Sequence, residues 1–591
     1  MTYAPPVAEQ LFVLKHVALI DELAAHERFT EATPDMVEAI VSGVGDFASG
    51  EYAPLNRVGD QVGARWDAGQ VTMPPGFREA YAAFVASGWG SLDGPVAYGG
   101  QGLPFSLFSV MMEDLGTANM GFSLVNMLTP AAIEALHAHG SEAQKTTYLP
   151  KLISGEWTGT MNLTEPQAGS DVGALKTMAT PVESGDHAGQ WRVKGTKIFI
   201  TFGEHDLTDN IVHLVLARTP DAPPGTRGIS LFLVPKYRLD ADGAIDEAND
   251  VACVSIEHKL GIHASPTCVM SFGDHDACYG ELVGDLHGGM RAMFTMMNNA
   301  RLNVGNQGMQ IAERATQSAL AYAAERIQGS RTRLGPIADT PRADVGPVAI
   351  IEHPDVRRML IRMKALTQAA RALTYYAAGQ ADRASLGLDG AQARVDILTP
   401  LVKAYGTDIG CEVASLGVQV HGGMGYVEET GAAQHYRDAR IAPIYEGTNG
   451  IQAADLVGRK MTIDGGAAIK QLIDDIRSGA KGAAPLALLA DDCAEVAAWM
   501  QANASSDDRL AGSTPFLTML SVATCGWLMT IEVAALDGDS TVSPDFVAAK
   551  RQAASFYIDQ IVPQAAGLKA AAMAGAAPLY AVDAATLIGR D

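Results

Sequence analysis

The sequence predicts a mainly helical protein with a β domain in its middle. Apolar residues recur at helical spacing from about residue 7 to residue 150, and short segments rich in β-branched and aromatic residues fill roughly 157–280. Helical spacing returns after Gly289. The 591 residues are too many for one core. We expect four domains: an N-terminal helical domain (1–156), a middle β domain (157–283), a four-helix bundle (284–460) and an additional C-terminal helical domain (461–591).

The first domain is predicted to begin with a helix over residues 7–25, VAEQLFVLKHVALIDELAA. A second helix is expected to begin at Pro34, because Thr33 suits the N-cap, proline suits the first helical position and Asp35 favours the positive end of the helix dipole. The segment GPVAYGGQGLP (94–104) has four glycines and two prolines, so it is expected to be a loop.

The middle domain contains four segments with the length and composition of β-strands. Each is rich in β-branched or aromatic residues and is bounded by turn residues. They are QWRVKGTKIFIT (190–201), NIVHLVLAR (210–218), GISLFLVP (228–235) and PTCVMSFGD (266–274).

The remaining chain is predicted to be helical. Three or four long helices with short connections indicate an up-and-down bundle, and a methionine-rich stripe near residues 290–297 is interpreted as core packing. Four prolines mark 330–354 as an extended loop. After a linker that begins at Met461, an Ala-rich helical segment carries no motif for chemistry, so we expect a structural role.

The composition limits the classes of partner. The formal net charge of −24 argues against nucleic acid or an anionic membrane as the main partner, and no membrane insertion is expected. The six cysteines form no CxxC pair, which favours free thiols in a reducing compartment and predicts no bound metal. The N-terminus resembles neither a secretory signal nor a transit peptide, so we expect a cytoplasmic protein.

Three motifs each leave two interpretations open. LTEPQAGSD (163–171) is either a surface loop or a tight turn that offers N–H groups and hydroxyls to a ligand. QVHGGMGY (419–426) lacks the GxGxxG spacing, so its glycines allow either a helix C-cap or close approach to a pyrophosphate. In IYEGTNG (444–450), Glu446 is either a turn residue that faces water or a positioned base.

Eight segments between about residues 80 and 460 resemble, in order, those of the acyl-CoA dehydrogenases. They are YGGQGL (98–103), LPKLISGEWTGTMNLTEPQAGSD (149–171), VKGTKIFITFGEHD (193–206), RGISLFLVP (227–235), HKLGIHASPT (258–267), MMNNARLNVGNQG (296–308), QVHGGMGYVEE (419–429) and RDARIAPIYEGTNGIQ (437–452). The 330–354 insertion and the C-terminal segment resemble the longer bacterial branch. This resemblance implies the family's fold, a helical domain, a β-barrel-like domain and a four-helix bundle, and FAD bound without a Rossmann unit.

The resemblance also implies which residues bind FAD. Leu163 and Thr164 should lie along the flavin ring, Thr201 should hydrogen-bond near its reactive nitrogen, and Ser170 is a weaker candidate for cofactor and CoA contacts. Phe199 stands where the family usually has Trp, and Phe202 stands where it usually has Asn.

A second set of residues is implied to bind FAD from the helical part. Arg326 and Gln328 match positions that reach the FAD of a neighbouring subunit, so a homodimer or dimer of dimers is implied. The remaining matches, on the pyrophosphate and nearby, are Gln419, Gly422, Gly423, Thr448 and Gln452.

Desaturation of an acyl thioester requires a carboxylate that removes the α-proton while a β-hydride leaves for the flavin. Glu446 matches the family's base, and burial would raise its pKa towards the working range. The family's alternative base position holds Ala300 here, which leaves Glu446 as the candidate. Arg301 matches an arginine near the base and CoA, Asn298 is a weaker CoA contact, and Gly447 gives room to the thioester.

The resemblance implies a short acyl-CoA substrate, 3-(methylthio)propanoyl-CoA in particular, oxidised to its 2-enoyl-CoA with electrons passed to electron-transfer flavoprotein. One alternative is a broad-range dehydrogenase of short and medium fatty acyl-CoAs, and another is an acyl-CoA oxidase that uses oxygen. A DNA-binding flavoprotein of the same fold is disfavoured, because residues 461–591 carry eight basic and fifteen acidic residues, a balance of −7.

Overall fold

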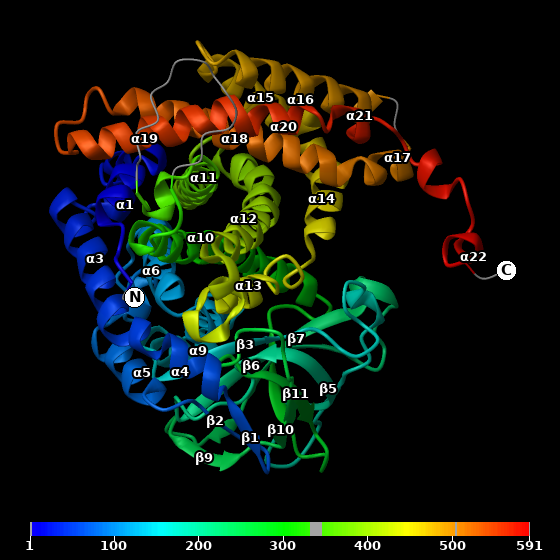
Figure 1. The fold of residues 1–591 in the computed structure, drawn as a ribbon. Coiled ribbons are helices and arrows are strands. Elements are labelled where there is room, and N and C mark those ends of the chain that lie inside the picture. Colours follow the sequence, from blue (N-terminus) through cyan, green and yellow to red (C-terminus); the bar gives the residue numbers. More distant parts are fainter. Residues whose placement is uncertain (1–2, 331–345, 503–504, 590–591) are drawn as a thin grey trace, which may run out of the picture. The chain divides into compact units, whose positions relative to one another are not determined.

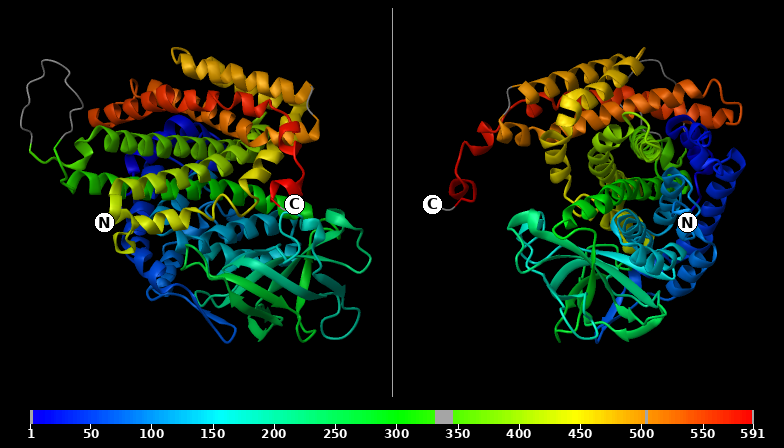
Figure 2. Two further views of the ribbon diagram at one scale, coloured as in Figure 1. Left: turned by 45° about the vertical axis from the view of Figure 1, so that its right-hand side comes forward. Right: turned by 180° about the vertical axis from the view of Figure 1, so that it is seen from behind.

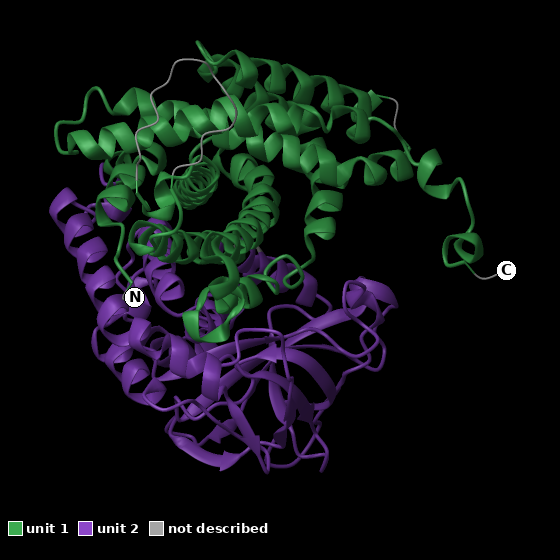
Figure 3. Ribbon diagram, viewed as in Figure 1, with its two compact units in different colours: residues 1, 3–23, 304–591 green, residues 2, 24–303 purple. Residues whose placement is uncertain are grey.

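The computed structural model describes residues 3–330, 346–502 and 505–589, without the side chains of residues 298 and 299. These residues form two compact units (Figure 3): residues 3–23 with 304–591, and residues 24–303. The boundary falls inside one long helix, α10 (Gly289–Glu325). The four-domain division made from the sequence stays a prediction, and each unit is described below by itself.

One helix of the unit 24–303 begins where the local sequence signals predict it. In α3 (Pro34–Phe47), Thr33 is the N-cap and its hydroxyl accepts from the Met36 N–H at 3.4 Å, which confirms the predicted start. Every residue of α6 after Phe105 is buried. The other longer helices of this unit are α4 (Asn56–Val62), α5 (Phe77–Ala86), α6 (Phe105–Ala118), α8 (Val125–His139) and α9 (Glu142–Ser154).

That unit also contains an eight-stranded sheet (Figure 1), in the order β10-β11-β5-β12-β7-β6-β3, with β4 paired to β5 and β6, and two separate two-stranded sheets. All four predicted strands are present, and β3 runs parallel to β6. The strands are β3 (Trp157–Asn162), β4 (Met178–Pro181), β5 (Trp191–Thr201), β6 (Asn210–Arg218), β7 (Ile229–Pro235), β10 (Val251–Ile256), β11 (Thr267–Phe272) and β12 (Tyr279–Val283).

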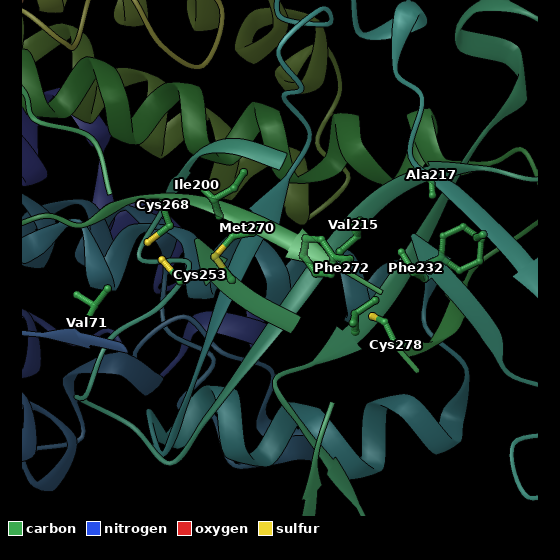
Figure 4. Close-up of a cluster of buried hydrophobic side chains, with 13 residues drawn as sticks. Val71, Ile200, Val215, Ala217, Phe232, Cys253, Cys268, Met270, Phe272 and Cys278 are labelled. Carbon is green, nitrogen blue, oxygen red and sulfur yellow. The ribbon is translucent and has the colours of Figure 1, made fainter. Parts of the chain in front are cut away.

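The sheet encloses a core of buried apolar side chains from both its central and its edge strands (Figure 4). Val215 and Phe232 are fully buried, and Cys253, Cys268 and Phe272 are at most 1% exposed. The sequence did not predict β3, whose six residues are all buried and therefore show no alternation of polar and apolar positions.

The other unit is built from long helices. The predicted helical bundle is confirmed by α10, α11 (Pro354–Ser385), α12 (Ala391–His421) and α14 (Asn449–Gly458), and the short α13 (Ala432–Ala439) follows α12. The C-terminal helices α18 (Ser513–Ala535) and α19 (Pro544–Phe556) pack against α11 and cross it (Figures 1 and 2). The remaining longer helices are α15 (Ala467–Gly479) and α16 (Ala484–Ala502).

Helix α18 is long and apolar enough to cross a membrane by length and composition alone, with a mean hydropathy of 1.5 over 18 residues. However, 72% of that window is buried inside the structure, and the core helix of a globular protein has the same character. The expectation of no membrane insertion therefore stays a prediction.

The predicted first helix is interrupted, which the apolar spacing did not reveal. The structure has α1 (Val7–Val13), a π-helical turn to Ala18, and α2 (Ile20–Leu23), with Leu19 in the left-handed region at φ 57°. The break frees backbone carbonyls, and the Arg383 guanidinium donates to the carbonyl of Ala18 at 2.9 Å. Tertiary capture of these carbonyls by α11 thus ends the helix. Most of the predicted 330–354 loop lies outside the described residues.

Candidate active site

The LTEPQAGSD turn is docked on strand β5. The Lys197 ammonium donates to the carbonyl of Leu163 at 3.1 Å, and the Ile198 N–H donates to the carbonyl of Thr164 at 2.9 Å. Both Leu163 and Thr164 are partly buried, whereas Ser170 is exposed farther along the turn. The turn is therefore held in a fixed register against β5 rather than lying loosely on the surface.

A buried ion pair holds this turn. Glu165 Oε1 lies 2.8 Å from Lys197 Nζ, with side chains 4% and 0% exposed. Burial alone would raise the pKa of the Glu165 carboxyl, but Lys197 and the hydrogen bonds from Thr177 and Lys176 lower it to about 2. Burial lowers the pKa of Lys197 to about 8 against the opposing effect of Glu165. Both groups are ionised at neutral pH.

Phe199 occupies a β-bulge near the end of β5. The pairing of β11 with β5 shifts register between Cys268 and Met270, opposite Phe199. Phe199 takes φ 60°, and it is 58% exposed although it is aromatic. A bulge re-aims a side chain out of the strand's alternation, so the ring is presented at the surface of this unit. Thr201 is partly buried beyond it, and Phe202 is 2% exposed.

Glu446 lies in the loop between α13 and α14, and its backbone is left-handed, with φ 55°. Gly447 follows with φ 84°. Two successive positive φ values turn the chain sharply, and a non-glycine residue there carries a cost of about 1–3 kcal/mol. Glu446 is partly buried. Such strain is kept where the surroundings fix the conformation.

Two anchors hold the loop on either side of Glu446. The Tyr445 hydroxyl donates to Oε1 of Gln307 in α10. On the other side, the Asn449 amide oxygen accepts from the Lys403 ammonium at 2.9 Å, and its nitrogen donates to Asp408 at 2.8 Å, both in α12. Burial and the nearby Glu446 carboxylate raise the pKa of Tyr445 well above its usual range.

The two helices that supply these anchors cross with their backbones in contact. A Cβ added at Gly308 of α10 would lie 2.0 Å from the carbonyl oxygen of Gly406 in α12, and one added at Gly305 would lie 2.5 Å from that of Val402. Glycine is required here by close approach. The contact places Gln307 on one side of the loop and Lys403 on the other.

Thr448 and Gln452 lie at the start of α14. Thr448 is the N-cap, and its hydroxyl accepts from the Ile451 N–H at 3.1 Å. Gln452 is fully buried, and neither its amide nitrogen nor its amide oxygen has a hydrogen-bond partner among the described residues. A buried amide without hydrogen-bond partners costs free energy, so the amide of Gln452 is a candidate to bond a ligand.

The QVHGGMGY segment forms the C-terminal end of α12. Gln419 is exposed in the last turn, and Gly422 leaves the helix with φ 61°. A Cβ at Gly422 or at Gly423 would meet nothing within 4 Å, so the backbone there is open to close approach. Gly422 is therefore a helix C-cap, as one interpretation of the sequence had it, and the close approach to a pyrophosphate stays a prediction.

Arg326 and Gln328 follow the end of α10, where both are exposed. The Arg326 guanidinium donates to the side-chain oxygen of Gln328 at 3.1 Å. The backbone of this segment pairs with residues 348–350, since the Ile350 N–H donates to the Arg326 carbonyl at 2.8 Å. The two predicted residues are thus brought together on one short, ordered segment.

The remaining predicted residues lie in α10. Arg301 is 6% exposed, and Ala300 is fully buried. The side chain of Asn298 lies outside the described residues. Ala300 occupies the family's alternative base position, and alanine has no carboxylate, so this position cannot supply the base in this chain.

Sequence reasoning missed the residues that hold these segments, above all Lys197, Lys403 and Gln307. One signal was present for Lys197: it lies on the same face of β5 as the core residue Val193, so its position in the strand is an inward one. Lys403 and Gln307 gave no such signal, because their roles follow from how α10 and α12 cross.

Four family models match successive parts of the chain. They are the acyl-CoA dehydrogenase N-terminal domain (34–156), its middle domain (160–275), its C-terminal domain (337–461), and the acetyl-CoA dehydrogenase C-terminal-like domain (466–583). The chain belongs to the acyl-CoA dehydrogenase family, and it is an FAD-dependent oxidoreductase that acts on acyl-CoA.

Two relatives and one solved structure show the extent of the likeness. The chain is 45% identical to 3-methylmercaptopropionyl-CoA dehydrogenase of Ruegeria pomeroyi, over 95% of this chain and 96% of the relative. It is 36% identical to a butyryl-CoA dehydrogenase of Syntrophomonas wolfei, over 88% of each. A Bacillus anthracis acyl-CoA dehydrogenase complexed with FAD has the same fold, with a TM-score of 0.71 and 21% identity over 95% of this chain and 91% of that one.

The residues present fit FAD. The exposed ring of Phe199 offers an aromatic surface for a flavin, and the open backbone at Gly422 and Gly423 offers unobstructed approach to a pyrophosphate. The buried amide of Gln452, without a partner among the described residues, is a polar group that a ligand-bound arrangement would satisfy.

Proposed function

We propose that this enzyme oxidises a short acyl-CoA thioester, 3-(methylthio)propanoyl-CoA, to its 2-enoyl-CoA. The relative of that activity in Ruegeria pomeroyi, 45% identical over almost the whole of both chains, supports this substrate. Sulfur and methylene are similar in size and apolarity, so short straight-chain acyl-CoAs, such as butanoyl-CoA with a chain one atom shorter, should also enter. The butyryl-CoA dehydrogenase relatives support the short chain length.

The observation that carries the mechanism is the conformation of Glu446. This residue is the one carboxylate between Asp438 and Asp455, and it is held left-handed between the Tyr445 and Asn449 anchors. Glycine would adopt this left-handed backbone without strain, yet the position holds a glutamate whose conformation is fixed. This favours a positioned base over an ordinary turn residue. Glu446 removes the proton from the α-carbon and holds it on its carboxylate.

The thioester oxygen gains negative charge as that proton leaves, and the N–H of Glu446 is the donor we assign to it. Gly447 gives room for the thioester beside the base. Arg301 is 6% exposed and balances charge near the CoA end, where Ser170 and Asn298 are weaker contacts. FAD, when bound, accepts the β-hydrogen as hydride.

The residues we assign to FAD have three roles. Leu163, Thr164, Phe199 and Thr201 contact the flavin, with Ser170 nearby. Gln419, Gly422 and Gly423 contact the pyrophosphate. Arg326, Gln328, Thr448 and Gln452 complete the set, and Arg326 and Gln328 act on the FAD of a neighbouring subunit in a homodimer or dimer of dimers.

We assign electron-transfer flavoprotein as the electron acceptor, as the family assignment supports, and a cytoplasmic location. All six cysteines are free thiols, five of them buried, which fits a reducing compartment. Peroxide formed in air at the rate of turnover would instead make the enzyme an oxidase.

A steady-state panel of acyl-CoAs with a ferrocenium-type acceptor tests the substrate. We expect turnover of 3-(methylthio)propanoyl-CoA and butanoyl-CoA and poor turnover of long chains, because the two relatives described above are named for short substrates. Efficient use of palmitoyl-CoA with neither short substrate accepted would overturn the assignment.

A further inference from the structure

The Glu165–Lys197 ion pair joins the two segments of the β domain to which we assign flavin contacts. Leu163 and Thr164 lie on the LTEPQAGSD turn, and Phe199 and Thr201 lie at the end of β5. Lys197 belongs to the second segment, two residues before Phe199, and its ammonium donates to Leu163 of the first. The inference below rests on that assignment of flavin contacts.

The pair is more extensively bonded than a turn requires. Glu165 Oε1 accepts from the Lys197 ammonium at 2.8 Å, from the Thr177 hydroxyl at 2.5 Å and from the Thr177 N–H at 3.0 Å. Its other oxygen accepts from the Lys176 N–H at 2.6 Å and from the Gln167 amide at 2.6 Å. The carboxylate thus ties the turn both to Lys176 and Thr177, which follow it in the chain, and to Lys197 of β5.

Stability alone does not explain such a pair. Two charges with 0% and 4% of their side chains exposed lose hydration, and apolar residues of similar volume are often at least as stable at such sites. What an ion pair adds is a defined geometry, because the ammonium must meet the carboxylate and the Leu163 carbonyl together. The bulge at Phe199 begins directly after this fixed point.

We propose that Lys197 and Glu165 are positioning residues for the flavin: the pair sets the spacing between the Leu163–Thr164 backbone and the bulged Phe199–Thr201 segment. The two segments are then ordered before the cofactor arrives, so binding does not have to order them. Neither residue touches the reacting atoms; each acts through the segments that it holds.

The test compares Lys197→Met, Glu165→Gln and the double variant as full-length holoenzymes. The double variant removes both charges together, so no unpaired charge remains buried. It therefore provides the test if a single variant fails to fold. Lys194→Met is the matched control, because Lys194 lies on the same strand as Lys197 and forms an exposed ion pair with Asp276, with side chains 60% and 64% exposed. The readouts are the FAD dissociation constant, the visible circular dichroism of bound flavin, and kcat and KM separately.

We expect the double variant to bind FAD at least tenfold more weakly, with an altered flavin dichroism and a lowered kcat at unchanged KM for acyl-CoA. Lys194→Met should match the wild type in every readout. If the double variant folds and matches Lys194→Met in FAD affinity, dichroism and kcat, the pair is not a positioning device. That result leaves the proposed function intact, whereas a wild-type enzyme that binds FAD but turns over no acyl-CoA contradicts the function itself.

Discussion

At the scale of single residues, the candidate base is defined by its backbone as much as by its carboxylate. The left-handed backbone of Glu446, with φ 55°, costs about 1–3 kcal/mol of conformational energy relative to a relaxed residue. The sequence revealed its chemical type and its glycine neighbour, and it also showed that Ala300 removes the alternative. It could not reveal the strain, because the positive φ of the glutamate depends on contacts of its loop with two other helices, α10 and α12, and the α10 anchor Gln307 lies 138 residues before Tyr445.

Tyr445→Phe tests the first anchor of that loop. Loss of the hydroxyl leaves Gln307 without this donor, so we expect a loss of about 1–3 kcal/mol in the free energy of unfolding and a severalfold lower kcat. Urea unfolding and steady-state kinetics measure both. Tyr580→Phe is the control, because Tyr580 is 74% exposed and should change neither quantity. Wild-type kcat in Tyr445→Phe would mean that the anchor does not position Glu446.

At the scale of elements, two helices cross closely enough to place both anchors. The sequence predicted α10 and α12 from their spacing of apolar residues, and it predicted β5 almost to its ends. It did not predict the bulge at Phe199 or the break at Leu19. Both depend on partners distant in sequence, since β11 shifts register against β5 and Arg383 captures the carbonyl of Ala18.

Gly308→Ala tests the crossing. The new Cβ would lie 2.0 Å from the Gly406 carbonyl oxygen, so the helices must separate. Overpacking costs about 1–3 kcal/mol or more, which exceeds the roughly 1 kcal/mol that alanine gains over glycine in a helix. We expect a lower urea midpoint together with a lower kcat.

Gly458→Ala is the matched control for Gly308→Ala. Gly458 ends α14, and a Cβ there would meet nothing within 4 Å. This variant should be neutral or slightly more stable, with wild-type kcat. If both alanine variants behave alike, the close contact between α10 and α12 does not position the catalytic loop.

At the scale of the whole molecule, a buried charge cluster joins the first residues of the chain to its last helices within one compact unit. The Lys550 ammonium lies 2.6 Å from Glu9 and 2.7 Å from Glu532, and Arg371 lies 2.8 Å from Glu313. The sequence predicted a C-terminal helical segment without chemistry, but it could not predict that residues 3–23 belong to the same unit as residues 304–591. Pairings more than 500 residues apart leave no local pattern.

This cluster predicts a pH dependence. Burial raises the pKa of Glu532 to about 6 against the opposing effect of Lys550, and its Oε2 has no partner among the described residues. Because the pKa of Glu532 is higher in the folded state than the unfolded value of 4.5, protonation of Glu532 stabilises the folded protein. This contribution to the free energy of unfolding is fully present below pH 4.5 and is lost as the pH rises through 6. Over this pH range the free energy of unfolding changes by about 2 kcal/mol through Glu532 alone.

Glu532→Gln removes that titration. Between pH 7 and pH 5, we expect the wild type to gain about 1 kcal/mol in the free energy of unfolding relative to this variant, as followed by urea unfolding at both pH values. Asp545→Asn, an exposed change at the start of α19, should show no such difference from the wild type. A pH-independent difference between Glu532→Gln and the wild type would mean that Glu532 is ionised throughout this range.

The most direct test of Glu446 as the base is the rate of flavin reduction after anaerobic mixing of the holoenzyme with 3-(methylthio)propanoyl-CoA. We predict that Glu446→Gln, with FAD bound normally, bleaches the flavin roughly 10²–10⁴-fold more slowly than the wild type, since the amide cannot accept the α-proton. Glu429→Gln, an exposed change, should match the wild type. Flavin reduction by Glu446→Gln at the wild-type rate would contradict the mechanism.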